Sequence, residues 1–150
     1  MNGITWTSIY EIFPLFPPSS KHPQIYFRVS DNKGVILLNR LRVGFSHLRE
    51  HKFRHNLADT VDPFCNCRTN SVETTLHFLM HCSDDYSNDR NVMFNRLLWL
   101  DITLFPFNPE ILCRILFYGD PNFSAAQNHG ILTIAIKFIR DSGCFGVPLY

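Results

Sequence analysis

The sequence has no apolar run that approaches the roughly 18–20 residues needed to span a bilayer. Its start, MNGITWTSIYEIFPLFPP, has no basic region, contains an acid and is interrupted by prolines, which argues against a secretory signal peptide. No internal repeat or low-complexity tract is present. Five cysteines, an odd number, cannot all pair in one disulfide framework. We therefore expect a reduced intracellular protein of the nucleus or cytoplasm, without a membrane partner.

Charged residues are also scarce, because they make up 18% of the chain against a usual share of about a quarter. We expect a partner to cover part of the surface, or the chain to belong to something larger. The net charge of +1 is unevenly spread: residues 1–60 contain eight Lys and Arg against four Asp and Glu, and residues 61–150 contain six against nine. This asymmetry predicts a basic face in the first half and an acidic remainder.

The 150 residues suffice for one domain with a packed core, since 45% of them are hydrophobic. Residues 1–33 are predicted to form an irregular arm, because PLFPPSSKHP is rich in proline, which is excluded from helix interiors. Within this arm, only QIYFRV is typical of a short strand. The sequence pattern of residues 34–150 predicts a mostly α domain of about four to five helices with a small zinc-knuckle hairpin.

The apolar pattern predicts where these helices lie. Apolar residues at spacings of one, four, four and three predict a first helix through residues 36–55. A second covers about residues 84–100, a third opens at Pro109 and closes at Gly119, and a last helix runs through NHGILTIAIKFIRDSG. A short helix beginning near Ser71 is predicted to follow the cysteine-rich stretch described below. The apolar face of the last helix comprises Ile131, Ile134, Ala135, Phe138 and Ile139.

The first predicted helix is strongly basic, and Glu50 is the only acid between residues 40 and 55. Its cationic and histidine residues are Arg40, Arg42, His47, Arg49, His51, Lys52, Arg54 and His55. Such a cluster neutralises phosphates, so these residues are candidates for contacts with an RNA or DNA backbone. The alternative is a solvated basic face that binds nothing, or one that packs against a partner domain.

The stretch FCNCRTNSVETTLHFLMHC gathers three cysteines and two histidines. Cys65 and Cys67 are two residues apart, so in an extended segment they point to the same side. His77 and Cys82 follow, and three thiolates with one imidazole suit a tetrahedral Zn²⁺ site. His81 offers a rival ligand, because it is four residues from His77 and faces the same direction on a helix. The other alternative is a set of ordinary core residues, since free cysteine is often buried.

The two remaining cysteines carry no metal prediction. Cys113 lies in the apolar helical stretch ILCRILF and is predicted to be a core residue. Cys144 lies near the C-terminus with no histidine close by in the sequence, and it is assigned no role.

The segment LLNRLRVGFSHLREHKFRHNLADTVDPFCNCRTNSVETTLHFLMHC resembles the region just downstream of the polymerase core in jockey-like non-LTR retrotransposon reverse transcriptases. The family pattern there is a basic helix, then P-x-C-x-C, then E-T-x-x-H-[FY]-L-L-x-C-P. This chain carries RLRVGFSHLREHKFRHN, DPFCNC and ETTLHFLMHC, and its end from ILFYGDPNF onward is also similar to the family. The resemblance extends over residues 34–150. Ser83 departs from it, where the family usually has proline, which affects the helix exit and not the ligands.

The resemblance implies a reverse-transcriptase zinc-binding region. Carried over by position, the zinc ligands are Cys65, Cys67, His77 and Cys82. The resemblance therefore favours Cys82 over His81. It implies RNA or DNA as the partner of residues 40–55, and a polymerase domain acting in trans is a further candidate partner.

Polymerase chemistry is not expected of this chain. Reverse transcription needs catalytic aspartates, some of them in a Tyr-x-Asp-Asp turn that holds two metal ions. The stretch SDDYSND contains Asp84 and Asp85 in the reverse order and after the cysteines, so it is not that turn. Neither polymerase fingers and palm nor an endonuclease domain is recognisable. We expect a non-enzymatic, retroelement-derived zinc module that binds nucleic-acid backbone; the alternative is a structural or protein-interaction remnant with no present activity.

Overall fold

The computed structural model describes residues 31–57, 60–67, 69–83, 87–102, 108–143 and 145. Residues 1–30 of the predicted arm, with the short strand, lie outside them, whereas Asn32 and Lys33, which were placed in the arm, begin a helix. The described part is mostly helical, as predicted, and none of its helices is long and apolar enough to cross a bilayer. The elements are α2 (Asn32–Val43), α3 (Arg49–Arg54), the π-helical turn η2 (His77–His81), α4 (Ser87–Leu98), α5 (Pro109–Tyr118) and α6 (Ala125–Asp141).

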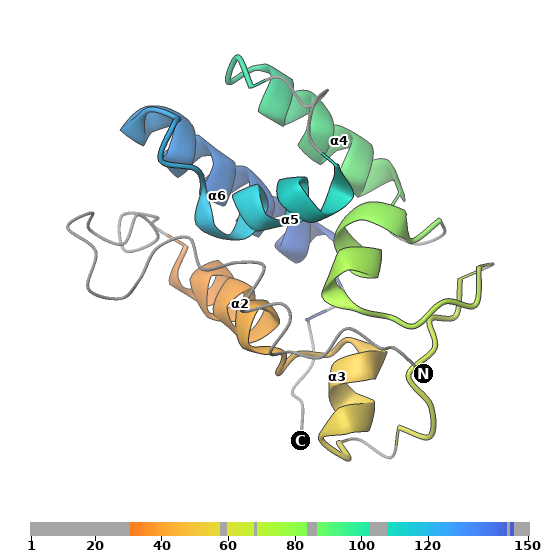
Figure 1. Ribbon diagram of the computed structural model, residues 1–150. Coiled ribbons are helices and arrows are strands. Elements are labelled where there is room, and N and C mark those ends of the chain that lie inside the picture. Colours follow the sequence, from red (N-terminus) through yellow and green to blue (C-terminus); the bar gives the residue numbers. More distant parts are fainter. Residues whose placement is uncertain are drawn as a thin grey trace.

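Helix α6 is the centre of the helical packing, because α2, α4 and α5 all contact it (Figure 1). Its predicted apolar face is confirmed: four of the five residues are buried in the main core, and Ile134 is partly buried against it. Phe138 of α6 packs on Phe78 with ring centroids 5.1 Å apart. Since Phe78 belongs to η2, this contact joins the cysteine-rich half of the chain to the central helix.

The boundaries of α5 and α6 follow from their caps. The Asn108 side chain accepts a hydrogen bond from the Ile111 amide, Pro109 occupies the first turn, and Gly119 ends α5 at φ +72°. Helix α6 begins before the predicted stretch, because Ser124 and Gln127 form a reciprocal capping box. The second predicted helix is also present as α4, which begins at Ser87.

The prediction of one continuous helix through residues 36–55 is wrong. Helix α2 ends at Gly44, whose φ of +74° is the left-handed conformation that favours glycine. The Gly44 amide bonds to the Leu41 carbonyl and the Phe45 amide to the Arg40 carbonyl, the two bonds that close a Schellman motif. The chain then turns and re-enters a helix at Arg49. The apolar spacing continued through the break, so periodicity alone did not reveal it.

Candidate metal centre

The first two cysteines lie on one arm of a short hairpin. Phe64 and Val72 form an antiparallel bridge, and the Cys65 amide donates a 2.7 Å hydrogen bond to the Ser71 carbonyl. Cys65 and Cys67 are buried, whereas the residue between them is exposed. The alternation of an extended segment therefore places both thiols on the inner side, as predicted.

The other two candidates come from the end of the following helix. This helix begins at Thr75, four residues later than predicted, and the Thr74 hydroxyl accepts a 3.1 Å hydrogen bond from the His77 amide. Two residues five apart on an α-helix are rotated by about 140° from each other. Here the Cys82 amide bonds to the His77 carbonyl at 2.8 Å, which widens the turn, and Cys82 is itself extended (φ −60°, ψ 125°). Both changes bring Cys82 to the side of His77.

The four side chains converge. The Sγ atoms of Cys65 and Cys82 are 3.7 Å apart, and both cysteines are free thiols. The Cys67 Sγ lies 3.4 Å from Nε2 of His77. All four donor atoms lie within 4.8 Å of one another, and all four residues are buried. This group could hold a metal ion, and the fold rather than closeness in sequence brings its four side chains together.

His81, the rival ligand, is exposed and is not a member of this group. It lies on η2 one residue before Cys82, where the helical path directs the two side chains apart. Cys113, in contrast, lies in the main apolar core, as predicted. The three cysteines of the candidate centre form a small buried cluster separate from that core. Cys144 lies outside the described residues.

The two hairpin thiols have different acidities. Burial raises the pKa of the Cys65 thiol well above its usual range. Burial acts in the same direction on Cys67, but hydrogen bonds from the Thr69 hydroxyl and backbone outweigh it and lower the pKa of Cys67 to about 6. Because metal ligands must be thiolates, a metal ion bound here would have to displace the proton of the Cys65 thiol.

Acidic side chains join the hairpin to α3. The Glu73 carboxylate accepts a 2.8 Å hydrogen bond from the Arg49 amide in the first turn of α3. Leu48 precedes that turn and offers no side-chain cap, so Glu73 supplies one from 24 residues away. Arg49 also pairs with Asp62 through a 3.1 Å contact. Sequence reasoning did not find this role of Glu73, because no local pattern marks a cap supplied by a distant residue.

Three of the eight predicted nucleic-acid contacts are buried. Arg42 donates to the Asn39 side chain at 2.9 Å and to the Phe117 carbonyl, and its guanidinium lies 4.7 Å from the ring centroid of Tyr118. His47 is also buried and packs edge-on against a core phenylalanine. His51 is fully buried. These three side chains hold the fold together and are not presented to a phosphate.

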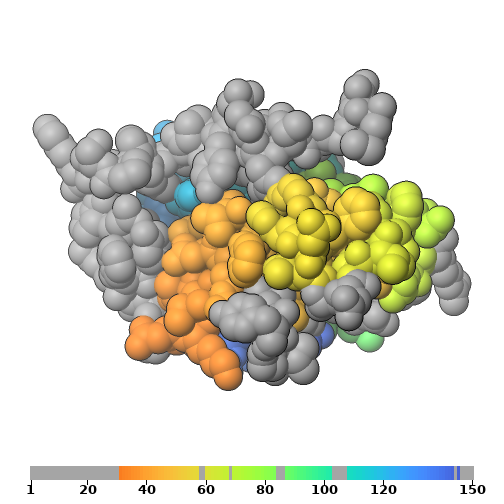
Figure 2. Space-filling model, turned by 90° about the horizontal axis from the view of Figure 1, so that it is seen from below, coloured from red at the N-terminus to blue at the C-terminus, as the bar shows by residue number. Residues whose placement is uncertain are grey.

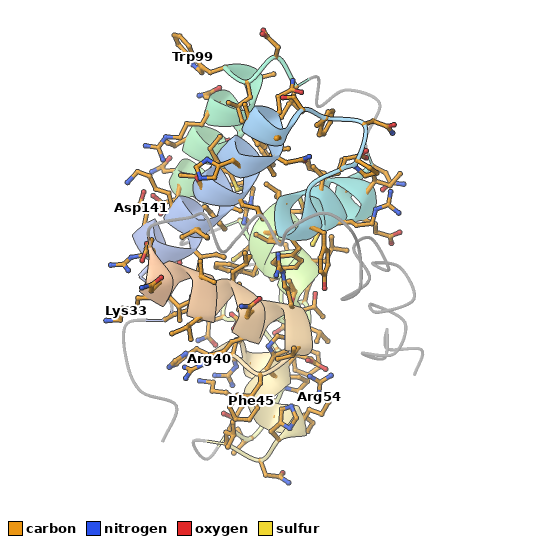
Figure 3. All side chains as sticks on the ribbon, turned by 90° about the vertical axis from the view of Figure 1, so that its left-hand side faces the viewer. Lys33, Arg40, Phe45, Arg54, Trp99 and Asp141 are labelled. Carbon is orange, nitrogen blue, oxygen red and sulfur yellow. The ribbon has the colours of Figure 1, made fainter. Side chains whose placement is uncertain are left out.

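The other five predicted contacts are at least partly exposed. They are Arg40, Arg49, Lys52, Arg54 and His55. Arg54 donates a 2.8 Å hydrogen bond to the Gly44 carbonyl and lies 3.6 Å from Glu50. Helices α2 and α3 and the hairpin form one continuous face of the molecule (Figure 2). Lys33, Arg40 and Arg54 lie in the lower part of the view in Figure 3, far from Trp99 at the top.

One further side chain at the centre escaped prediction. Arg90 of α4 is buried and donates hydrogen bonds to the carbonyls of Phe78, Leu79 and Cys82. It occupies the buried stripe of α4 with Met93 and Leu97, at spacings of three and seven. The sequence signal that could have revealed Arg90 is a cation at a position where the helical period predicts an apolar residue.

Comparison with protein-family models, with curated proteins and with solved structures gives no match to this chain. The chemistry of the residues at the centre therefore carries the functional argument.

Proposed function

We propose that Cys65, Cys67, His77 and Cys82 bind one zinc ion, and that the resulting module binds nucleic-acid backbone through the exposed cations of α2 and α3. The observation that carries the zinc site is the convergence of four buried donor atoms within 4.8 Å. Three thiolates and one imidazole form a soft donor set that suits zinc better than magnesium or calcium.

The spacing of the donors supports this assignment. With Zn–S bonds of about 2.3 Å and a Zn–N bond of about 2.0–2.1 Å, a tetrahedron separates two sulfurs by about 3.8 Å and a sulfur from a nitrogen by about 3.6 Å. The corresponding distances are 3.7 Å between Cys65 and Cys82 and 3.4 Å between Cys67 and His77. Four protein ligands leave no position for water or substrate, so the proposed ion stabilises structure and does not catalyse a reaction.

The resemblance to retrotransposon reverse transcriptases supports the same assignment independently. Its pattern designates the four residues that the fold brings together, and it passes over His81. We therefore extend the proposal to origin: the chain derives from the zinc-binding region of a retroelement protein. In such a protein, the module would hold template RNA or target DNA by its backbone.

The proposed nucleic-acid surface rests on Arg40 and Lys52 above all. Both are partly exposed, and neither has an ion pair or a side-chain hydrogen bond within the part of the chain that the structure describes. Arg49 and Arg54 already pair with carboxylates, but about a quarter of each side chain stays accessible. Free and half-paired cations on α2 and α3 can replace the counterions of a phosphate backbone.

A protein-contact module is the second candidate. Ile36, Val43 and Phe53 are exposed on the same two helices, with 43–53% of each residue accessible. Apolar side chains interspersed with cations suit a surface that packs on a partner domain, such as a polymerase acting in trans. Salt separates the two functions, because phosphate binding weakens steeply with salt and apolar packing does not.

The zinc site is tested by the zinc content of the purified protein. We expect one zinc per chain in the wild type, and almost none in Cys65→Ser and His77→Ala. Cys113→Ser is the matched control, because Cys113 is an equally buried free thiol outside the cluster. Equal zinc contents in Cys65→Ser and Cys113→Ser would contradict the assignment.

The nucleic-acid surface is tested by titration of RNA and DNA oligonucleotides at several salt concentrations. Four phosphate contacts, one for each of Arg40, Arg49, Lys52 and Arg54, predict a log–log slope of about −2.8 to −3.6. The double variant Arg40→Gln/Lys52→Gln should flatten that slope by about 1.4–1.8. The control is Arg96→Gln/Lys137→Gln, which removes the same charge from α4 and α6. Equal flattening in both variants would show that net charge and not this face governs binding.

A further inference from the structure

The chain leaves η2 at the position where the last ligand must be fixed. Cys82 follows the helical turn in an extended conformation, and the next residue is exposed. The last carbonyls of a helix have no partner within the helix. A ligand at such an end depends on contacts from elsewhere in the fold to keep its direction.

Arg90 supplies those contacts. Its Nε donates to the Leu79 carbonyl at 2.7 Å, its Nη1 to the Cys82 carbonyl at 2.6 Å, and its Nη2 to the Phe78 carbonyl at 2.9 Å. Arg90 is 7% exposed, so water competes weakly for these charge-assisted bonds. One rigid guanidinium thus ties the end of the helix to the backbone of the ligand itself.

From this geometry we infer that Arg90 is a positioning residue of the metal centre, which aims Cys82 at the ion by holding its backbone. The inference rests on the proposed zinc site. Positioning explains why a cation occupies the buried stripe of α4, where an apolar side chain would serve packing alone. It also explains the choice of arginine, because a lysine offers no planar fork that reaches three carbonyls at once.

Charge supports the same role. Three thiolates and a neutral imidazole around a divalent ion leave one net negative charge in a buried place. Arg90 brings a positive charge to the backbone of one of the three ligands. Electrostatic attraction is stronger in a buried site than in water, so this cation offsets the charge of the loaded centre.

The test measures metal affinity by competition with a chromophoric chelator, using zinc and cobalt on the full chain. Arg90→Met keeps the side-chain volume and removes the donors and the charge. Loss of an outer hydrogen-bonding partner weakens metal affinity by about 10–100-fold, and we expect a loss of this size. We also expect weaker thiolate-to-cobalt charge-transfer absorption, because Cys82 is no longer held toward the ion. Arg90→Lys should give an intermediate affinity.

Asn128→Ala is the control for a purely structural effect. Asn128 is a buried polar side chain of α6 that accepts a hydrogen bond from the Asp120 amide and donates to the Asp120 and Phe123 carbonyls. Its loss should lower the free energy of unfolding without changing the metal affinity of the folded protein or the cobalt spectrum.

The outcomes separate the inference from the zinc site itself. If the wild type binds neither zinc nor cobalt, the zinc site fails and the inference fails with it. If the wild type binds metal and Arg90→Met keeps its affinity and spectrum, only the positioning role is overturned. If Arg90→Met does not fold, Arg90→Lys decides: an affinity equal to that of Asn128→Ala would overturn the role.

Discussion

At the scale of single residues, the buried histidine His51 connects α3 to the helix that carries His77. Its Nδ1 lies 2.7 Å from the Ser46 hydroxyl, and its Nε2 lies 3.4 Å from the Thr75 hydroxyl. Burial, with a smaller contribution from the charges of Arg54 and His55, lowers the pKa of His51 to about 3. The folded protein therefore keeps His51 neutral at neutral and mildly acidic pH.

The lowered pKa of His51 predicts that the stability of the protein depends on pH. The unfolded chain has an ordinary histidine pKa of about 6.5, so between about pH 6.5 and pH 3 it binds a proton that folded His51 refuses. As the pH is lowered through this window, the free energy of unfolding should decrease by up to about 1.4 kcal/mol per pH unit. His51→Asn keeps a polar group near Ser46 and should remove this part of the slope, measured by urea denaturation at several pH values.

The control for that experiment is His129→Asn, which replaces an exposed histidine of α6. Its slope should match that of the wild type. If the stability of His51→Asn decreases on acidification as steeply as that of the wild type, His51 must take up its proton in the folded state as well. The same metal loading must be kept in all samples, because thiolate ligands also bind protons on metal release.

At the scale of elements, the break between α2 and α3 determines which basic side chains face outward. In a single helix, the side chains of residues 40–55 would have followed one unbroken helical pattern of exposed and buried positions. The turn at Gly44 instead carries Ser46, His47 and Leu48 into the interior, where all three are buried. The basic sequence is thereby divided into buried side chains that stabilise the fold and exposed ones that are available to a partner.

Substitution at Gly44 tests this element directly. An alanine in the left-handed conformation costs about 1–2 kcal/mol, so Gly44→Ala should lower the free energy of unfolding by about that amount. Asparagine tolerates this conformation better, and Gly44→Asn should lose less. Chemical denaturation of the two variants measures the difference. Equal stabilities of Gly44→Ala and the wild type would contradict a required left-handed residue at this position.

At the scale of the whole molecule, the described fold contains two separate buried clusters. The main apolar core surrounds α6 and includes Phe78 and Leu79 of η2. The three cysteines Cys65, Cys67 and Cys82 form a second cluster outside it. The hairpin contacts the rest of the fold through these cysteines, through Glu73 and through the Arg49–Asp62 pair, and it adds little apolar surface to the core.

Removal of metal should therefore act unevenly. With a strong chelator, we expect amide hydrogens of the described residues between 60 and 74 to exchange faster by at least tenfold, because the hairpin would lose the crosslink that the proposed zinc ion supplies. Amides of α4, α5 and α6 should keep most of their protection, since the apolar core remains. Hydrogen exchange followed by mass spectrometry measures both regions in one sample, and the wild type without chelator serves as the loaded reference. Uniform loss of protection in α6 and the hairpin would contradict this division.

The sequence alone determined the features that depend on near neighbours. Pro109 and Gly119 delimited α5, the apolar spacing of α6 identified its buried face, and Cys113 was recognised as a core residue. The two-residue spacing of Cys65 and Cys67 fixed their common side. In each case the physical cause is local: a cap, a backbone conformation or the period of a helix or strand.

Only the tertiary structure decided the features that join distant parts of the chain. Helical spacing left His81 open as a rival and only the family resemblance favoured Cys82; the widened turn at η2 is what brings Cys82 to the centre. Packing against α5 buried Arg42, and a carboxylate 24 residues away capped α3. Arg90 reached two carbonyls of η2 and that of Cys82, which follows it. Burial and long-range hydrogen bonds depend on which surfaces meet, and the pattern of a single segment does not contain that information.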